Sequence, residues 1–563
     1  MSETATRQPT PLDQIAEDYV AKVVAKDPFT ATMMGVPGHD GDVPDYSPKG
    51  LQESANLARE TLDKLDDVDI QDDVDKVTLA AMKDRLGIYL ELHDAGEDLA
   101  SLNVLASPLQ EMRDIFDLMK TDTVENWQDI ASRMSKLPQV MSGYIESLKA
   151  GAQRGLVPAI RQVNEGIKQA EALAGADSFF VKFAAKGAES GAKDNPELQQ
   201  KLQDAATKAQ GAYRELADFL KNELAPQAPE KDGVGKERYE RFSRLFLGEN
   251  IDLEETYQWG VRELRNIIAE QQKLAEEIAG SGATVEQAVK KLEADEKYTL
   301  HGVEELQKWM QETSNQAIQE LNGTQFTIPA EMQKLECMIA PTQNGGIYYT
   351  PPSDDMSRPG RMWWSVPEGV NDFQTWQQKT TVYHEGVPGH HLQLTTGIMN
   401  KDQLNSWRRN FCFCSGHGEG WALYAEKLMD ELGYLEDAAD KLGMLFGQRM
   451  RAARVVFDIG VHLGLNAPEE WGGKPWDAET GWKFLLANFD KDEEFVRFEY
   501  NRYLGWPGQA PAYKIGQRLW EQAKAAAEAA AAERGEEFDQ KKWHADALAL
   551  GGVPLSILRT ELE

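Results

Sequence analysis

Apolar residues keep to helical stripes along most of the chain. Between Asp252 and Ala279 one such stripe is followed by Gly280 as a stop, which predicts an amphipathic helix; its apolar members are Leu253, Tyr257, Val261, Leu264, Ile268 and Ile278. Thr284, with Gln287 three residues later, is typical of a capping box and predicts the start of another helix. Helical windows also dominate up to about Pro226, which indicates a mainly helical N-terminal region.

The pattern changes near Asn322. The short runs FTIP, KLECMIAP, GGIYYTPP and GRMWWSVP are rich in β-branched or aromatic residues and are separated by Gly, Pro and Asn. We predict a small antiparallel sheet here, directly before the segment HEGVPGHH (384–391), and helices again after Thr375. The chain is therefore expected to consist of a mainly helical region 1–321 and a region 322–563 with the sheet and further helices, together forming one compact unit.

Composition supports a large helical protein and narrows its partners. The 563 residues are 41% hydrophobic and 27% charged, with long stretches of Ala, Glu, Lys, Leu and Gln. Lys and Arg number 60 against 93 Asp and Glu, which gives a net charge of −33. Because such a surface repels phosphate backbones and anionic lipid, we expect no binding to nucleic acid or to a membrane.

The first residues and the cysteines bear on the compartment. The segment MSETATRQPTPLDQ lacks a basic start followed by an apolar core, so it does not resemble a signal peptide. The three cysteines, Cys337, Cys412 and Cys414, are too few and too odd in number for a disulfide framework. The sequence therefore predicts a cytoplasmic location.

The segment HEGVPGHH almost matches the zinc-binding motif H-E-x-x-H, in which two histidines four residues apart share a helix face. The fourth position after His384 is Pro388, and in a straight helix His390 would point away while His391 would lie about 10 Å further along the axis. Pro388 followed by Gly389 favours a kink or bulge that brings His390 to the usual position. His391 stays open as a neighbour, a substrate contact or the ligand in place of His390.

A hydrolytic zinc site needs three protein ligands and one open position. The segment CSGHGEGWALYAEKL supplies Glu419, at the start of an amphipathic pattern and 29 residues after His390. The predicted zinc ligands are thus His384, His390 and Glu419, with His417 and Glu426 close enough to orient the imidazoles. Single histidines on helices are usually ordinary polar residues, but here four of the nine histidines fall between residues 384 and 417.

Several longer motifs resemble one family over nearly the whole chain. They are YHEGVPGHHLQ, GEGWALYAEKLMDELGY, RVVFDIGVHLGLN, YLGWPGQAPAYKIG and ALALGGVPLSIL, and they are similar to those of the bacterial Domain of Unknown Function 885 family. That family resembles the gluzincin metallopeptidases, so the resemblance implies a large, mainly α metallopeptidase-like fold with a deep central cleft, and hydrolysis. Thimet-oligopeptidase-like enzymes have H-E-x-G-H, two residues shorter than the segment here, and dipeptidyl peptidase III tolerates one extra residue in the same turn.

Candidate catalytic residues follow from the chemistry and from this resemblance. Glu385, beside a ligand, is the expected general base. Similar peptidases use a tyrosine from a downstream loop to bind the oxyanion, which makes Tyr513 the first candidate and Tyr503 the second. His462 shares a helix face with Arg454 and Asp458 and is either part of a structural charge ladder or a contact to the substrate.

These observations predict a zinc-dependent peptidase that acts on short peptides and holds them against a strand edge beside the metal helix. Two alternatives remain: a metal-dependent hydrolase of a non-peptide amide or ester, and a catalytically inactive, peptidase-like protein that binds peptides. Metal content and turnover that depends on Glu385 separate the inactive protein from the two enzymes. The oligomeric state is not predicted.

Overall fold

The computed structural model describes residues 7–341, 346–353 and 355–562. The chain forms two compact units. Unit 1 is built mainly from Gly235–Val496 and Pro507–Glu563, and unit 2 from Pro9–Val234 together with Arg497–Trp506. The predicted division at residue 321 followed the onset of strand-rich sequence. Along the chain, these units instead change after Val234, and the segment Arg497–Trp506 belongs again to unit 2.

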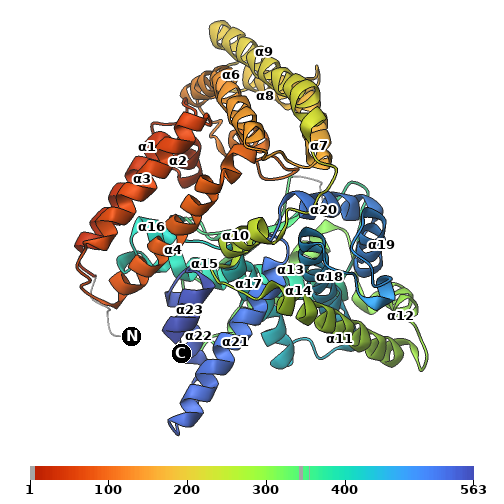
Figure 1. The fold of residues 1–563 in the computed structure, drawn as a ribbon. Helices are drawn as coiled ribbons and strands as arrows, with labels where there is room; N and C mark the ends of the chain where they lie inside the picture. Colours follow the sequence, from red (N-terminus) through yellow and green to blue (C-terminus); the bar gives the residue numbers. More distant parts are fainter. Residues whose placement is uncertain (1–6, 342–345, 354, 563) are drawn as a thin grey trace. The chain divides into compact units, whose positions relative to one another are not determined.

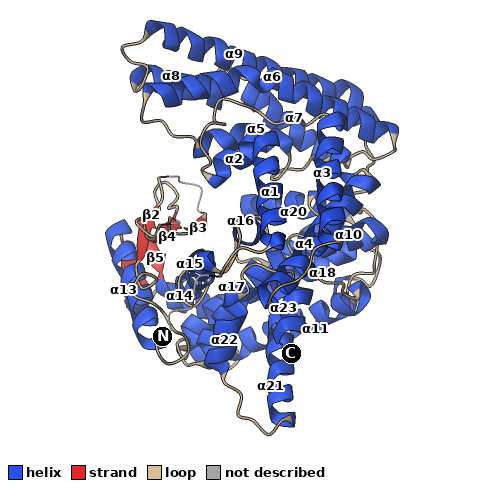
Figure 2. Ribbon diagram, turned by 90° about the vertical axis from the view of Figure 1, so that its left-hand side faces the viewer, coloured by secondary structure: helices blue, strands red, loops and turns tan. Residues whose placement is uncertain are grey.

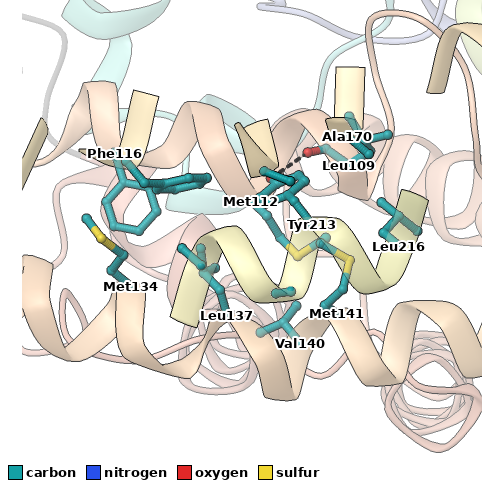
Figure 3. Close-up of a cluster of buried hydrophobic side chains, with 14 of the residues drawn as sticks. Leu109, Met112, Phe116, Met134, Leu137, Val140, Met141, Ala170, Tyr213 and Leu216 are labelled. Carbon is teal, nitrogen blue, oxygen red and sulfur yellow. Dashed lines mark hydrogen bonds between the residues drawn. The ribbon is translucent and has the colours of Figure 1, made fainter. Parts of the chain in front are cut away.

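Unit 2 is a set of helices around an apolar core (Figure 1). Its main helices are α1 (Pro11–Lys26), α3 (Pro48–Asp66), α4 (Asp73–Ala95), α6 (Val124–Gln153), α7 (Ile160–Ala174), α8 (Phe179–Glu189) and α9 (Pro196–Phe219). Figure 3 shows the centre of the core, where Leu137 and Met141 of α6 pack near Tyr213 of α9. The Tyr213 hydroxyl donates a hydrogen bond of 2.8 Å to the carbonyl of Leu109, so the one polar atom of this side chain is paired.

Unit 1 carries the helices that surround the predicted metal ligands. They are α10 (Lys236–Leu247), α11 (Leu253–Ala279), α12 (Val285–Glu293), α13 (Val303–Leu321), α14 (Thr375–Glu385), α15 (His390–Met399), α17 (Ser415–Glu431), α18 (Ala438–Leu463), α21 (Ala512–Glu533), α22 (Gln540–Ala549) and α23 (Leu555–Leu562). The prediction of a helix from Asp252 is confirmed, with Asp252 as the cap that accepts from two backbone amides. The capping box of Thr284 and Gln287 is also confirmed, at the start of α12.

Two small sheets complete unit 1, shown in red in Figure 2. β1 (Thr299–His301) pairs antiparallel with β5 (Asp372–Gln374), which leads directly into α14. The other sheet has the order β2-β4-β3 and comprises β2 (Leu335–Ile339), β3 (Ile347–Thr350) and β4 (Gly360–Trp364). The mainly α fold with a small sheet is therefore confirmed.

The prediction that this sheet is antiparallel is wrong in part. β3 and β4 are antiparallel, but β2 and β4 are parallel. The chain reverses direction between β2 and β3 and again between β3 and β4, so the first and third strands run the same way. Because β4 lies between the other two strands, it must pair with β2 in parallel.

None of the helices in the described part of the chain is both long enough and apolar enough to cross a membrane.

Candidate metal centre

The segment HEGVPGHH forms the end of one helix and the start of another. α14 ends at Glu385 and α15 begins at His390, so the expected bulge within a single helix is instead a break. The amide of Gly386 still bonds to Val382, the amide of Gly389 bonds back to the carbonyl of Tyr383 at 3.0 Å, and the Val387–Pro388 peptide bond is cis. The two hydrogen bonds hold the connection close to the end of α14, and the start of α15 returns to it, so that the ring centres of His384 and His390 lie 4.9 Å apart.

Close backbone contacts explain the two glycines in this connection. A Cβ atom at Gly389 would lie 1.9 Å from the carbonyl oxygen of His384, and one at Gly386 would lie 2.6 Å from that of Val382. Neither position has room for a side chain. The indole Nε1 of Trp421 donates to the carbonyl of Pro388 at 2.9 Å, which attaches the connection to α17.

The break places His390 beside His384, with Glu419 of α17 between their outer nitrogens. Glu419 Oε2 lies 3.4 Å from His384 Nε2 and 3.6 Å from His390 Nε2. One ligand atom from each of the three residues lies within 4.8 Å of the others, a spacing at which they can hold a metal ion. Glu419 Oε2 is also buried and has no hydrogen-bond partner in the described part of the chain, so the group has an acceptor that a cation would satisfy.

The protonation states of His384, His390 and Glu419 depend on one another. Burial acts to raise the pKa of Glu419, but the adjacent imidazoles of His384 and His390 outweigh it and hold the pKa well below the usual value. Burial likewise acts to lower the pKa of His384, yet the adjacent carboxylates of Glu419 and Glu426 raise it to about 10. The carboxylate is thus ionised, as a ligand must be, and a cation at this position would compete with protons on the imidazoles.

A second carboxylate fixes the orientation of His384. Glu426 is 1% exposed, and its Oε1 lies 2.7 Å from His384 Nδ1 while its Oε2 accepts a bond of 2.6 Å from Thr380. Arg451 Nη2 is 3.9 Å from the same Oε1. With Nδ1 engaged by a carboxylate, His384 Nε2 faces Glu419, which is the arrangement of metal-binding histidines in general.

His391 and His417 point elsewhere. His391 is fully buried, with Nε2 2.7 Å from the carbonyl of Met332 and Nδ1 2.8 Å from the hydroxyl of Tyr349 on β3. Burial lowers the pKa of His391 to about 4. His417 packs its ring at 5.1 Å from that of Trp520, and burial lowers its pKa to about 4 as well. The histidine that joins His384 and Glu419 is therefore His390.

Glycines position α17 and hence Glu419. A Cβ at Gly420 would lie 2.5 Å from the backbone of Gly516 on α21, and one at Gly516 would lie 2.2 Å from the carbonyl of Gly416. The two helix backbones are in direct contact at this point, and any side chain would push them apart. The spacing of small residues in GHGEG is the signal in the sequence for this contact, and it was not among the predicted features.

The other predicted residues lie in different surroundings. Glu385, the last residue of α14, is 7% exposed, and its charge contributes to the raised pKa of His384. Tyr513, near the start of α21, is half-buried, and the guanidinium of Arg454 lies 5.1 Å from its ring centre. Tyr503 belongs to unit 2, where it is fully buried and its hydroxyl donates to Glu499.

His462 is part of a buried network on α18. Its Nε2 lies 3.8 Å from Asp458 Oδ1, and Asp458 Oδ2 accepts from the hydroxyl of Tyr239 at 2.7 Å and from the amide of Gly508 at 2.8 Å. The roles of His462, Tyr513 and Glu385 in a reaction stay predictions.

Comparisons with known proteins agree with this fold. No curated protein matches the chain. A crystal structure described as "the putative lipoprotein from Colwellia psychrerythraea" is similar with a TM-score of 0.82 at 20% identity, and the match covers 98% of each chain. A "putative lipoprotein of unknown function from Shewanella oneidensis" is similar with a TM-score of 0.76 at 14% identity, covering 98% of this chain and 100% of the other.

These two matches correct one prediction. Both proteins with this fold are described as lipoproteins, which belong to the cell envelope, and this contradicts the cytoplasmic location inferred from the first residues and the three cysteines. The cysteines are free and buried, at Cys337, Cys412 and Cys414, so they pack as small apolar side chains and carry no information about the compartment. The family described as "Bacterial protein of unknown function (DUF885)" matches residues 28–562, and the chain therefore belongs to the DUF885 family.

Proposed function

We propose that this DUF885 protein is a zinc-dependent hydrolase that cleaves peptide bonds in short peptides. The observation that carries the proposal is the convergence of His384, His390 and Glu419 on one point, with Glu426 orienting His384 from behind. Two imidazoles and one carboxylate form a ligand set typical of catalytic zinc, which leaves a position open for water and substrate.

When bound, zinc would activate water and polarise the carbonyl of the substrate. Glu385, next to His384 in sequence, takes the proton from the attacking water and delivers it to the leaving amine. Tyr513 donates a hydrogen bond to the oxygen on which negative charge develops, and the cation of Arg454 beside its ring favours that role. His462, with Asp458 as its partner, is proposed to contact the substrate.

The enclosure of the ligands supports short peptides as substrates. The side chains of His384, His390 and Glu419 are only 7%, 15% and 23% exposed, so a loop of a folded protein would not reach them without unfolding. A deep cleft that admits extended chains is part of the proposal.

The small sheet offers an edge for such a chain. Gln311 of α13 bonds to both the amide of Cys337 and the carbonyl of Leu335, and Gln307 bonds to the carbonyl of Cys337, so side chains occupy the outer edge of β2. β3 forms the opposite edge, and its Tyr349 contacts His391, the neighbour of His390. We propose that the peptide runs along β3 and so passes the metal centre.

The lipoprotein descriptions of the two similar structures support a place in the cell envelope. The substrates would then be peptides present there rather than products of cytoplasmic protein turnover. The net charge of −33 continues to argue against nucleic acid as a partner.

Metal analysis of the purified protein beside the His384→Ala variant tests the proposal, together with hydrolysis of a peptide library by both proteins. We expect about one zinc per chain in the wild type, loss of that zinc in the variant, and cleavage only by the wild type. Wild-type protein that takes up no zinc when zinc is supplied would refute the metal centre. Bound zinc with cleavage of esters or non-peptide amides alone would refute the substrate class, and zinc with peptide binding but no cleavage would indicate an inactive binding protein.

A further inference from the structure

Gln393, on α15 one turn after His390, is a buried side chain whose carboxamide has no partner among the described residues. The residue is 8% exposed, and within this part of the chain neither Nε2 nor Oε1 forms a hydrogen bond. An unpaired buried polar group lowers stability, and native proteins contain few of them. Methionine has nearly the same shape without this penalty, so packing alone does not account for a glutamine at this position.

The carboxamide lies beside the proposed metal ligands. Residues three apart on a helix share a face, so Gln393 follows His390 along the same side of α15. On the facing helix α17, a Cβ at Gly418 would lie 3.9 Å from Gln393 Oε1, and Gly418 directly precedes Glu419. His390, Glu419 and the unpaired carboxamide therefore all lie where α15 and α17 face each other.

An exposed aromatic ring adjoins the same glycine. Phe413 is 56% exposed although its side chain is large and apolar, and its Cε2 and Cζ atoms would lie 3.0 and 3.3 Å from a Cβ at Gly418. A Cβ at Gly418 would thus lie close to both the ring and the carboxamide. Exposed side chains change rotamer within nanoseconds, so the ring of Phe413 can turn to admit a ligand to Gln393.

We propose that Gln393 and Phe413 form a subsite that binds the substrate beside the metal centre. The carboxamide presents one donor and one acceptor side by side and so matches the C=O and N–H of a peptide backbone. The ring of Phe413 packs against an apolar side chain next to that backbone unit. This inference rests on the proposed peptidase function and narrows its substrates to peptides with an apolar residue close to the cleaved bond.

The Gln393→Met variant distinguishes a role of Gln393 in substrate binding from a role in the stability of the fold. We expect KM for a cleaved peptide to rise about tenfold with kcat nearly unchanged, because one hydrogen-bonded contact to the substrate is lost. Zinc content should stay the same, and the melting temperature should stay the same or rise. Gln271→Met is the control: Gln271 is also buried and its Nε2 likewise has no partner among the described residues, but its Oε1 accepts a bond of 3.0 Å from Arg449, so this variant should lower the melting temperature and leave KM unchanged.

Ester-substituted peptides identify the contact itself. Each backbone amide other than the cleaved one is replaced in turn by an ester, which removes one N–H with little change of shape. The wild type is expected to lose about tenfold in kcat/KM at a single position, and Gln393→Met to show no loss at that position. Phe413→Ala should reduce the preference for Leu or Phe over Gly at a neighbouring position by about tenfold.

The outcomes distinguish this inference from the function on which it rests. An unchanged KM in Gln393→Met, or a lower melting temperature, overturns the subsite and leaves the peptidase function intact. A wild-type protein that cleaves no peptide overturns the proposed function, and the subsite with it.

Discussion

Units 1 and 2 are both mainly helical, yet they treat buried polar groups differently. In unit 2 the buried Arg133 donates to the carbonyls of Asp42, His39 and Pro28, and Tyr144 donates to the carbonyl of Ser101. These bonds connect the loops to α6 and leave an apolar core around them. At Arg133 and Tyr144, buried polar side chains of unit 2 therefore pair with backbone carbonyls of the same unit.

In unit 1 three titratable side chains, those of His384, His390 and Glu419, converge on one point. Seven of the nine histidines lie in its segments, at residues 301, 384, 390, 391, 417, 462 and 544. Within the described residues, both Glu419 Oε2 and the carboxamide of Gln393 are buried without partners. The packing of helices does not require such groups, and they lower stability unless a ligand pairs with them. The possible metal-binding group of His384, His390 and Glu419 lies in unit 1, so we expect the proposed function to depend on unit 1, and variants in each unit test this expectation.

The largest expected effect is that of Glu385→Gln in unit 1. The amide keeps the size of the side chain but cannot accept a proton, so kcat for peptide hydrolysis should fall about 10²–10⁴-fold. Zinc content and melting temperature should match those of the wild type, because Glu385 is not a proposed ligand. Steady-state kinetics beside metal analysis check both points, and turnover within twofold of the wild type would exclude Glu385 as the base.

Arg133→Met in unit 2 should have the opposite effect to Glu385→Gln, because it should lower the stability of unit 2 and leave the metal centre unchanged. Three backbone carbonyls lose their donor, and we expect unit 2 to be destabilised by about 3 kcal/mol. Hydrogen exchange measured on peptides of α6 and α9 would report this locally, while zinc content stays unchanged. Lys136→Met is the control: Lys136 donates to one carbonyl, that of Gly41, and its ion pair with Asp42 is exposed and expected to contribute under about 1 kcal/mol, so this variant should cost less stability than Arg133→Met. Loss of zinc in Arg133→Met would contradict the expectation that the metal centre stays unchanged.

Glu426→Gln tests the carboxylate behind His384. A neutral amide cannot hold the Nδ1 proton as strongly, so the affinity for zinc should fall about 10–100-fold while the ligand set is intact. Competition with a chelator measures this change. Glu521→Gln serves as the control, because Glu521 of α21 pairs at 3.0 Å with Lys427 of α17, the helix that also carries Glu426, and is not paired with a proposed ligand. Equal zinc affinity in the two variants would show that Glu426 does not position His384.

More of the candidate site than of the surrounding fold could be predicted from the sequence. His384, His390 and Glu419 follow from ligand chemistry and from the Pro388 and Gly389 pair, which signals that the helix does not continue. That the helix breaks, rather than bulges, depends on the contact of Gly389 with the carbonyl of His384 and on the bond from Trp421. Such contacts form only in the folded chain, and no local pattern encodes them.

Local signals also explain which elements of the fold were predicted. The helix from Asp252 has an apolar stripe, a cap and a stop within its own sequence, so its bounds could be predicted closely. The order β2-β4-β3 and the return of Arg497–Trp506 to unit 2 depend on partners far away in the chain. Gln393 was missed for the same reason, because a glutamine without partners is recognised only from its surroundings.

The smallest expected effect is a pH dependence of stability from His544, a buried histidine of unit 1 outside the ligand group. His544 is fully buried, stacks on Phe326 at 4.8 Å and lies 2.7 Å from the hydroxyl of Tyr424. Burial, assisted by the charge of Lys524, lowers its pKa to about 3. The unfolded chain takes up a proton near pH 6.5, whereas the folded chain does not until about pH 3. Protonation therefore favours the unfolded state throughout this window, and stability falls as the pH decreases through it.

His544→Gln removes this titration and should reduce the loss of stability by up to about 1.4 kcal/mol per pH unit below pH 6.5. Melting temperatures of the wild type and the variant between pH 7.5 and pH 5 would measure the difference in slope. Tyr424→Phe keeps the buried imidazole and should retain the slope of the wild type, even if its melting temperature is lower at every pH. Identical slopes in the wild type and His544→Gln would mean that His544 accepts its proton in the folded chain, and the closed packing of Phe326 and Tyr424 around a neutral ring would be wrong.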